Sequence, residues 1–189
     1  MVTSLTREIL GSTVLFENKF ELAKRTFYRE LPTGVRHVLF VDMNMQATKV
    51  FVVVGLNSRV VSRDIPADQA GVCHAHYLTP GGVVTRQAAY PAKNKEQLTA
   101  SLVRAAQACR EHAMPWFDAF QTLESVADVL PDDDDVLKGE LLLAHGAPGK
   151  ARPWLLRYRG RLLAMAPSPE VIEALRSTDS LLARCQVPG

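Results

Sequence analysis

The stretch from Lys24 to Asn57 constrains the fold more than any other part of this chain, because it reads as three consecutive antiparallel strands joined by two tight turns. Residues 26–30 are rich in aromatic and β-branched types, and Pro32 and Gly34 supply the chemistry of a turn. From residue 35 to 45 apolar side chains recur with a period of two, which is typical of a strand. The valine-rich run 50–54 is apolar on both faces and indicates a central strand covered on both sides.

The second half of the chain has helical periodicity. Apolar residues recur at spacings of three and four from Leu98 to His112, which predicts a helix of about five turns capped by Asn94. Further helices are expected near 122–130, 136–144, 154–165 and 169–182, with a turn at Pro148 and Gly149. The sequence therefore predicts an α+β fold: an antiparallel sheet of about four or five strands packed by a long helix in residues 1–130, and a C-terminal helical extension, 131–189, packed on it as one structural unit.

Composition excludes several classes of protein. The net charge of +2 is too small to imply nucleic acid or an anionic membrane as a partner. The apolar runs are far shorter than the roughly 20 residues that span a bilayer, and the N-terminus lacks the pattern of a secretory signal. The three cysteines are an odd number and lie far apart, which predicts reduced thiols in a cytoplasmic protein. No cofactor is expected.

A series of short motifs points to a family. An N-terminal helix is followed by the strands "FYRE", "VLFVDMNMQ", "FVVVGLNS" and "CHAHY", and then by a long helix that leads into "MPWFDAFQTLESVADVL". In this order the motifs resemble the DUF4304 family of bacterial domains over about residues 5–130. The most specific pieces are residues 25–29, 55–57 and 115–117. The resemblance implies an α+β domain with helices packed on an antiparallel sheet, and it carries over no catalytic or binding residue.

Polar residues on otherwise apolar strands are the candidates for a ligand groove. Strand alternation places His37 and Arg36 on opposite faces, and it places His74 and His76 on one face of their strand, away from Cys73. The groove candidates are Arg36, His37, His74, His76 and Tyr77. His74 and His76 could be two ligands of a zinc site, which would need further ligands such as His37 or His112. The second ligand pair that zinc motifs contain is absent, so the sequence predicts no metal site.

Other clusters have a structural interpretation beside the functional one. Cys109 and His112 lie one helical turn apart, as a nucleophile and base do, but Cys109 falls on an apolar helix face. The acidic run 132–135 lacks the spacing of a calcium loop, and helix capping and solvation explain it better. Trp116, Phe117 and Phe120 are typical of a core that locks a helix against a sheet. The arginines at 152–161 favour pairing with the acidic run over binding nucleic acid.

The sequence leaves three functions open and favours the first. This is a non-enzymatic binding or interaction module, which acts with a protein partner or as a homodimer, because no catalytic set converges and the second sheet face needs a cover. The second is an enzyme or small-ligand binder with a polar groove lined by His37, His74 and His76. The third is an immunity-type partner that neutralises a toxin, an expectation that follows only from a compact domain without catalytic residues.

Overall fold

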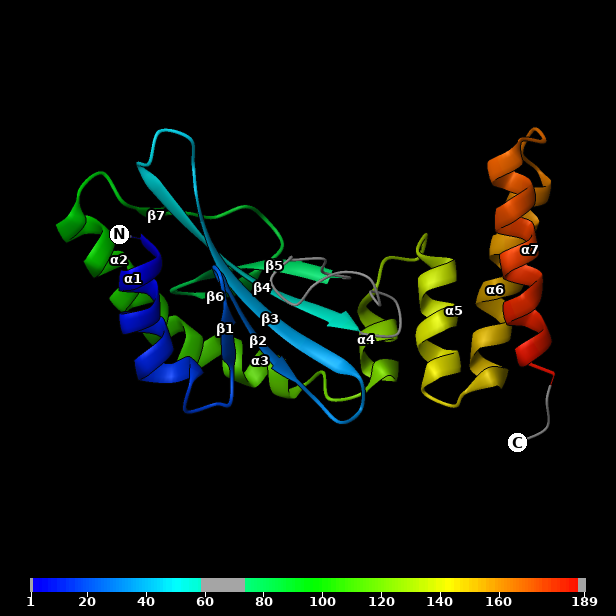
Figure 1. The fold of residues 1–189 in the computed structure, drawn as a ribbon, viewed down its shortest axis with the longest axis horizontal. Coiled ribbons are helices and arrows are strands. Elements are labelled where there is room, and N and C mark those ends of the chain that lie inside the picture. Colours follow the sequence, from blue (N-terminus) through cyan, green and yellow to red (C-terminus); the bar gives the residue numbers. More distant parts are fainter. Residues whose placement is uncertain (1, 59–73, 187–189) are drawn as a thin grey trace. The chain divides into compact units, whose positions relative to one another are not determined.

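The computed structural model describes residues 2–58 and 74–186, which form two compact units (Figure 1). The first unit, Met1–Gln121, combines an antiparallel sheet with helices, and the second unit, Thr122–Gly189, is helical. The predicted α+β fold is therefore confirmed. None of the helices in the described part of the chain is long and apolar enough to cross a bilayer.

The sheet of the first unit has seven strands within the described residues, more than the four or five that the sequence predicts. Neighbouring strands follow the order of the chain from β1 to β6, and β7 pairs with β4. The additional strands β1 and β7 have three and two residues, too few for a period of two to be visible. The strands are β1 (Glu21–Ala23), β2 (Thr26–Glu30), β3 (Val35–Met43), β4 (Lys49–Ser58), β5 (His74–Thr79), β6 (Gly82–Val84) and β7 (Tyr90–Pro91).

Two turns set the register of the three central strands. Gly34 has a φ of 86°, a conformation that glycine adopts without strain, and it closes the turn between β2 and β3. The turn between β3 and β4 is held by Asn44, whose side-chain oxygen accepts hydrogen bonds from the backbone N–H groups of Thr48 and Lys49, both at 2.8 Å. With these turns His37 lies opposite Leu56, and Phe40 lies opposite Val53.

The helices of the first unit cover one face of this sheet (Figure 1). The long predicted helix begins at the Asn94 cap, whose side chain accepts a hydrogen bond from the Gln97 N–H at 2.8 Å. Its residues Leu98, Leu102 and Cys109 are buried, as their spacing predicts. The helical segments are α1 (Val2–Thr6), η1 (Arg7–Leu15), α2 (Lys95–Ala108), η2 (Cys109–Ala113) and α3 (Met114–Asp118), of which η1 and η2 are π-helical.

In the second unit each helix packs on the helix that follows it in the chain. They are α4 (Leu123–Val129), α5 (Asp135–Ala144), α6 (Pro148–Leu163) and α7 (Pro169–Arg184). The predicted turn at Pro148 and Gly149 is wrong, because α6 begins at Pro148. Proline suits the first position of a helix, where its missing N–H would have no helical partner.

Candidate functional site

His37 is fully buried on the sheet face that the helices cover, and both of its ring nitrogens have partners. Its Nε2 lies 2.7 Å from the carbonyl oxygen of Phe120, so Nε2–H donates this hydrogen bond. Its Nδ1 accepts from the guanidinium of Arg29, with Nη2 at 3.0 Å. The ring also stacks on Phe117, with 4.8 Å between ring centroids. These contacts join β3 to the end of the helical layer and leave no ring nitrogen of His37 for a ligand.

Burial sets the charge of His37, against the opposing effect of the hydrogen bond to Phe120, which raises the pKa of the ring. Burial lowers the pKa of its ring from 6.5 to about 4, and the positive charge of Arg29 acts in the same direction. The ring is therefore neutral at pH 7, with its proton on Nε2. Arg29 itself lies across from His37 in β2, with its guanidinium over the ring of Phe20 at 5.2 Å. This arrangement is that of a histidine that holds the core together.

Arg36 lies on the opposite sheet face and is also buried. Its Nη2 donates to Glu30 Oε1 at 3.4 Å, and its guanidinium lies over the ring of Tyr28 at 5.8 Å. Because Arg36 and His37 face opposite sides of the sheet, they do not line one groove.

His74 and His76 share the sheet face of His37. Their Nε2 atoms are 2.5 Å apart, so one ring donates a hydrogen bond and the other accepts it. Burial lowers the pKa of both rings, which favours their neutral forms. In the register of the sheet Leu56 stands between His74 and His37.

A row of contacting aromatic rings lies between His76 and His37. His76 contacts Trp116, Trp116 contacts Phe117, and Phe117 stacks on His37. Phe117 is fully buried, which agrees with the interpretation of this aromatic cluster as core. The three histidines therefore share a sheet face, with Leu56 and the rings of Trp116 and Phe117 between His37 and the other two.

The possible metal ligands do not assemble in the described part of the chain. Among residues 2–58 and 74–186, no group of three or more His, Cys, Asp or Glu side chains is placed to hold a metal ion. Cys73 lies outside the described residues. The other proposed ligand, His112, has its Nε2 3.2 Å from the Pro80 carbonyl oxygen.

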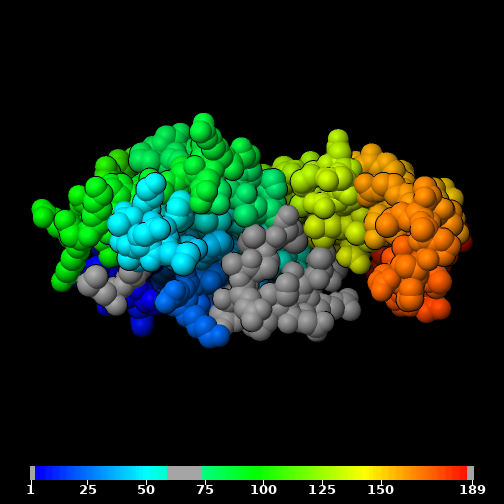
Figure 2. Space-filling view, turned by 90° about the horizontal axis from the view of Figure 1, so that it is seen from above, coloured from blue at the N-terminus to red at the C-terminus, as the bar shows by residue number. Residues whose placement is uncertain are grey.

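The sheet face that carries Tyr77 contains a groove of about 690 Å³. The β3–β4 hairpin, which forms one side of it, lies at the surface in cyan in Figure 2. The aromatic rings of Phe51 and Tyr77 pack edge to face, with centroids 6.3 Å apart. The described residues that line the groove are Phe40, Asp42, Met43, Asn44, Met45, Gln46, Phe51, Val53, Ala75, Tyr77 and Gln87.

Of the five groove candidates from the sequence, Tyr77 alone lines this groove. Sequence reasoning missed Phe40, Asp42 and Phe51, although strand alternation contains the signal that places them. Phe40 and Asp42 alternate with the buried residues of β3, and Phe51 lies opposite Asp42 in β4. The groove has an aromatic floor and a rim of carboxylate and amide side chains. It is suited to bind an apolar group with a cation beside it.

The Cys109 thiol is an unsuitable nucleophile. It is fully buried, and burial raises its pKa to about 12, so the reactive thiolate is not formed at neutral pH. Cys109 behaves as a small core residue, as its position on the apolar face of the helix predicts.

In the second unit the acidic run and the basic helix bind each other. Asp135 is fully buried, and it forms ion pairs with Arg157 and Arg161 of α6, the latter at 2.9 Å. Asp132 pairs with Lys138 at 3.1 Å. The prediction that arginines of 152–161 pair with this run is confirmed. Capping and solvation do not explain Asp135, because its carboxylate lies among the side chains of α6.

Comparison with known proteins adds no family to this description. No protein-family model, no curated protein and no solved structure matches the chain, so the resemblance to the DUF4304 family stays a prediction from its sequence.

Proposed function

We propose that this protein is a non-enzymatic binding module that uses the groove beside the β3–β4 hairpin to bind a protein partner. The observation that carries the proposal is the aromatic floor of this groove, made by Phe40, Phe51 and Tyr77. Aromatic side chains and methionine are enriched at the centres of protein interfaces, where they supply large contact area. Met45 at the groove edge is fully exposed, a position in which a methionine side chain is available to a partner.

The charge of the groove defines the chemistry of the partner. Asp42 is the charged residue among the described side chains that line it, and the remaining polar groups are three amides and the hydroxyl of Tyr77. A partner that inserts an apolar side chain next to a lysine or arginine would satisfy both parts of this surface. We therefore expect a basic segment on the partner and a binding affinity that falls with added salt.

The contacts of the histidines support a binding role over an enzymatic one. A general base needs a ring nitrogen within reach of substrate, whereas both nitrogens of His37 bind protein groups. His74 and His76 bind each other. Within the described residues these side chains make structural contacts.

The experiment compares two methionines of equal chemistry. The full-length protein is used as bait in a lysate of its source organism, the captured protein is identified and purified, and the Kd is measured by calorimetry. We expect Met45→Ser and Phe51→Ala each to raise the Kd by about tenfold or more. Met165→Ser is the matched control, because Met165 is exposed in the second unit, and it should leave the Kd unchanged.

Three results would contradict the proposal. The first is that no captured protein binds in purified form. The second is that Met45→Ser and Met165→Ser bind with equal Kd. The third is that Asp42→Asn, which keeps an acceptor for the Met43 N–H, leaves the salt dependence intact. Analytical ultracentrifugation tests a second copy as the occupant: a dimer dissociated by Met45→Ser would replace the separate partner with a homodimer.

A further inference from the structure

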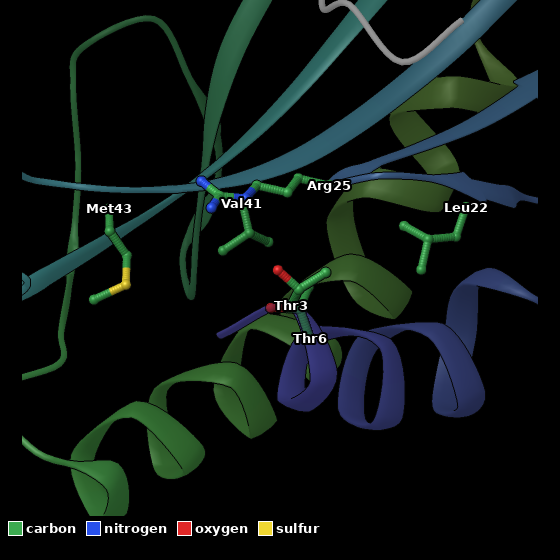
Figure 3. A pocket seen from close by; sticks show the side chains of 6 residues that line it. All are labelled: Thr3, Thr6, Leu22, Arg25, Val41 and Met43. Atoms are coloured by element: carbon green, nitrogen blue, oxygen red, sulfur yellow. The ribbon is translucent and has the colours of Figure 1, made fainter. Parts of the chain in front are cut away.

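A small pocket lies between the N-terminal helix and the sheet, away from the histidines (Figure 3). Its volume is about 100 Å³, and its described lining residues are Thr3, Thr6, Leu22, Arg25, Val41 and Met43. In Figure 3 the Thr6 side chain rises from α1 toward the strands, and Leu22 and Met43 extend from the strands toward the helix. The walls are mainly aliphatic, with two hydroxyl groups and one guanidinium.

Thr6 makes this pocket different from a packing defect. The residue is 5% exposed, and its Oγ1 is buried without a hydrogen-bond partner. A buried hydroxyl group without a partner destabilises a fold, so buried hydroxyls are normally hydrogen-bonded. Because the Thr6 side chain lines the pocket, a ligand with a hydrogen-bonding group would give its hydroxyl the missing partner.

Arg25 supplies the second polar feature. It follows β1 in the turn before β2, and Figure 3 shows its side chain extended along the sheet side of the pocket. Among the described residues, no carboxylate forms an ion pair with Arg25. A guanidinium group in this position is suited to bind a carboxylate through two parallel hydrogen bonds.

We infer that this pocket binds a short aliphatic monocarboxylate. The carboxylate lies between the guanidinium of Arg25 and the hydroxyl of Thr6, and the alkyl chain lies against Leu22, Val41 and Met43. Methionine suits such a wall, because its unbranched side chain adapts to the shape of a ligand.

The size and polarity of the pocket narrow the ligand class. Since a cavity of roughly 150 Å³ holds benzene, this one holds about four non-hydrogen atoms. An alkyl chain of about four or five carbons, as in hexanoate, therefore fills it when the carboxylate lies at Arg25. A phosphate group or a water molecule could bind the polar groups of the lining, but neither would fill the space beside the aliphatic walls.

The experiment follows the methionine methyl groups of the full-length protein by NMR. With ¹³C-methyl methionine, titration with sodium hexanoate should shift the Met43 signal to saturation, with a Kd below about 10 mM. The Met45 signal is the internal control for binding in the hairpin groove, because Met45 lines that groove and not this pocket. Hexylammonium, with the same chain and the opposite charge, should not shift Met43.

Substitutions of Arg25 and Thr6 test their contacts with the carboxylate one at a time. Arg25→Gln should raise the Kd for hexanoate by about tenfold or more, whereas Arg86→Gln, an exposed arginine outside the pocket, should not change it. Thr6→Val keeps the shape of the side chain, and it should weaken binding without lowering the melting temperature. A constant Met43 signal, equal binding of hexylammonium, or an unchanged Kd in Arg25→Gln would each overturn the inference. These results are independent of the test of the hairpin groove.

Discussion

At the scale of single residues, His37 lies between the guanidinium of Arg29 and the carbonyl of Phe120, and the contact with Arg29 requires a neutral ring because Nδ1 accepts this hydrogen bond. Its pKa falls from 6.5 to about 4 on folding, because the ring is buried. The unfolded chain therefore binds more protons than the folded chain between these pH values. The contribution of His37 to stability is full above pH 6.5 and is lost as the pH falls to 4, a change of about 3 kcal/mol.

This pH dependence is measurable by denaturant unfolding at several pH values between 7 and 4. In a Trp154→Phe background, fluorescence reports Trp116 of the first unit. The free energy of unfolding of this protein should fall by about 3 kcal/mol more than that of its His37→Gln variant. His74 and His76 are present in both proteins, so their titration cancels in the comparison. If the free energy of unfolding fell equally with pH in the two proteins, folding would not lower the pKa of His37.

Asp135 gives a second prediction at this scale. Asp135→Asn keeps the size of a fully buried side chain but removes the charge that binds Arg157 and Arg161. The two half-exposed arginines can turn to water, so the expected loss is about 1–3 kcal/mol in the stability of the second unit. Trp154 fluorescence in a Trp116→Phe background measures it. Asp133→Asn, at an exposed neighbour, should change the stability by less than about 0.5 kcal/mol.

At the scale of elements, α5 and α6 approach closely at one glycine. A Cβ atom on Gly139 would lie 2.5 Å from Leu155 Cδ2 and 2.6 Å from its Cγ, closer than carbon atoms pack. Gly139→Ala should therefore destabilise the second unit by about 1–3 kcal/mol, although alanine favours a helix. Gly160→Ala is the matched control inside α6, where nothing lies within 4 Å, and thermal unfolding should show stabilisation of up to about 1 kcal/mol. Equal effects of the two substitutions would exclude close packing as the cause.

The elements also show what the sequence determines by itself. The strands from Thr26 to Ser58 and the helix after Asn94 follow from periodicity and capping, because those signals are local. The strands β1 and β7 are too short to carry a period. The groove was missed for another reason. Strand alternation places Phe40 and Leu39 on opposite faces of the sheet, but it does not predict which of the two faces the helices cover. Tertiary packing determines which face is covered. Because the helices cover the face of His37, this residue lies in the core and not in a groove.

At the scale of the whole molecule, the division into two compact units predicts that residues 1–121 fold without the rest. The end of this segment is tied to the sheet by the Phe120 carbonyl, which binds His37, and by the Gln121 carbonyl, which accepts from Thr33 Oγ1 at 2.6 Å. The fragment 1–121 should unfold cooperatively in a thermal melt followed by circular dichroism. The fragment 1–118 lacks both carbonyls and should be less stable by about 1–3 kcal/mol. A disordered 1–121 fragment would mean that its stability depends on the second unit.

The order of the first four strands has a consequence for biosynthesis. β1 to β4 pair in the order in which they are made, and short turns join them. Each pairing closes a small loop, which loses little chain entropy, and hairpins form within microseconds. These strands are therefore able to pair on the ribosome before the helical residues 95–118 have been translated. During that interval the part of the sheet that α2 and α3 later cover is in water, so we expect the nascent sheet to be the stage at which this protein depends most on chaperones.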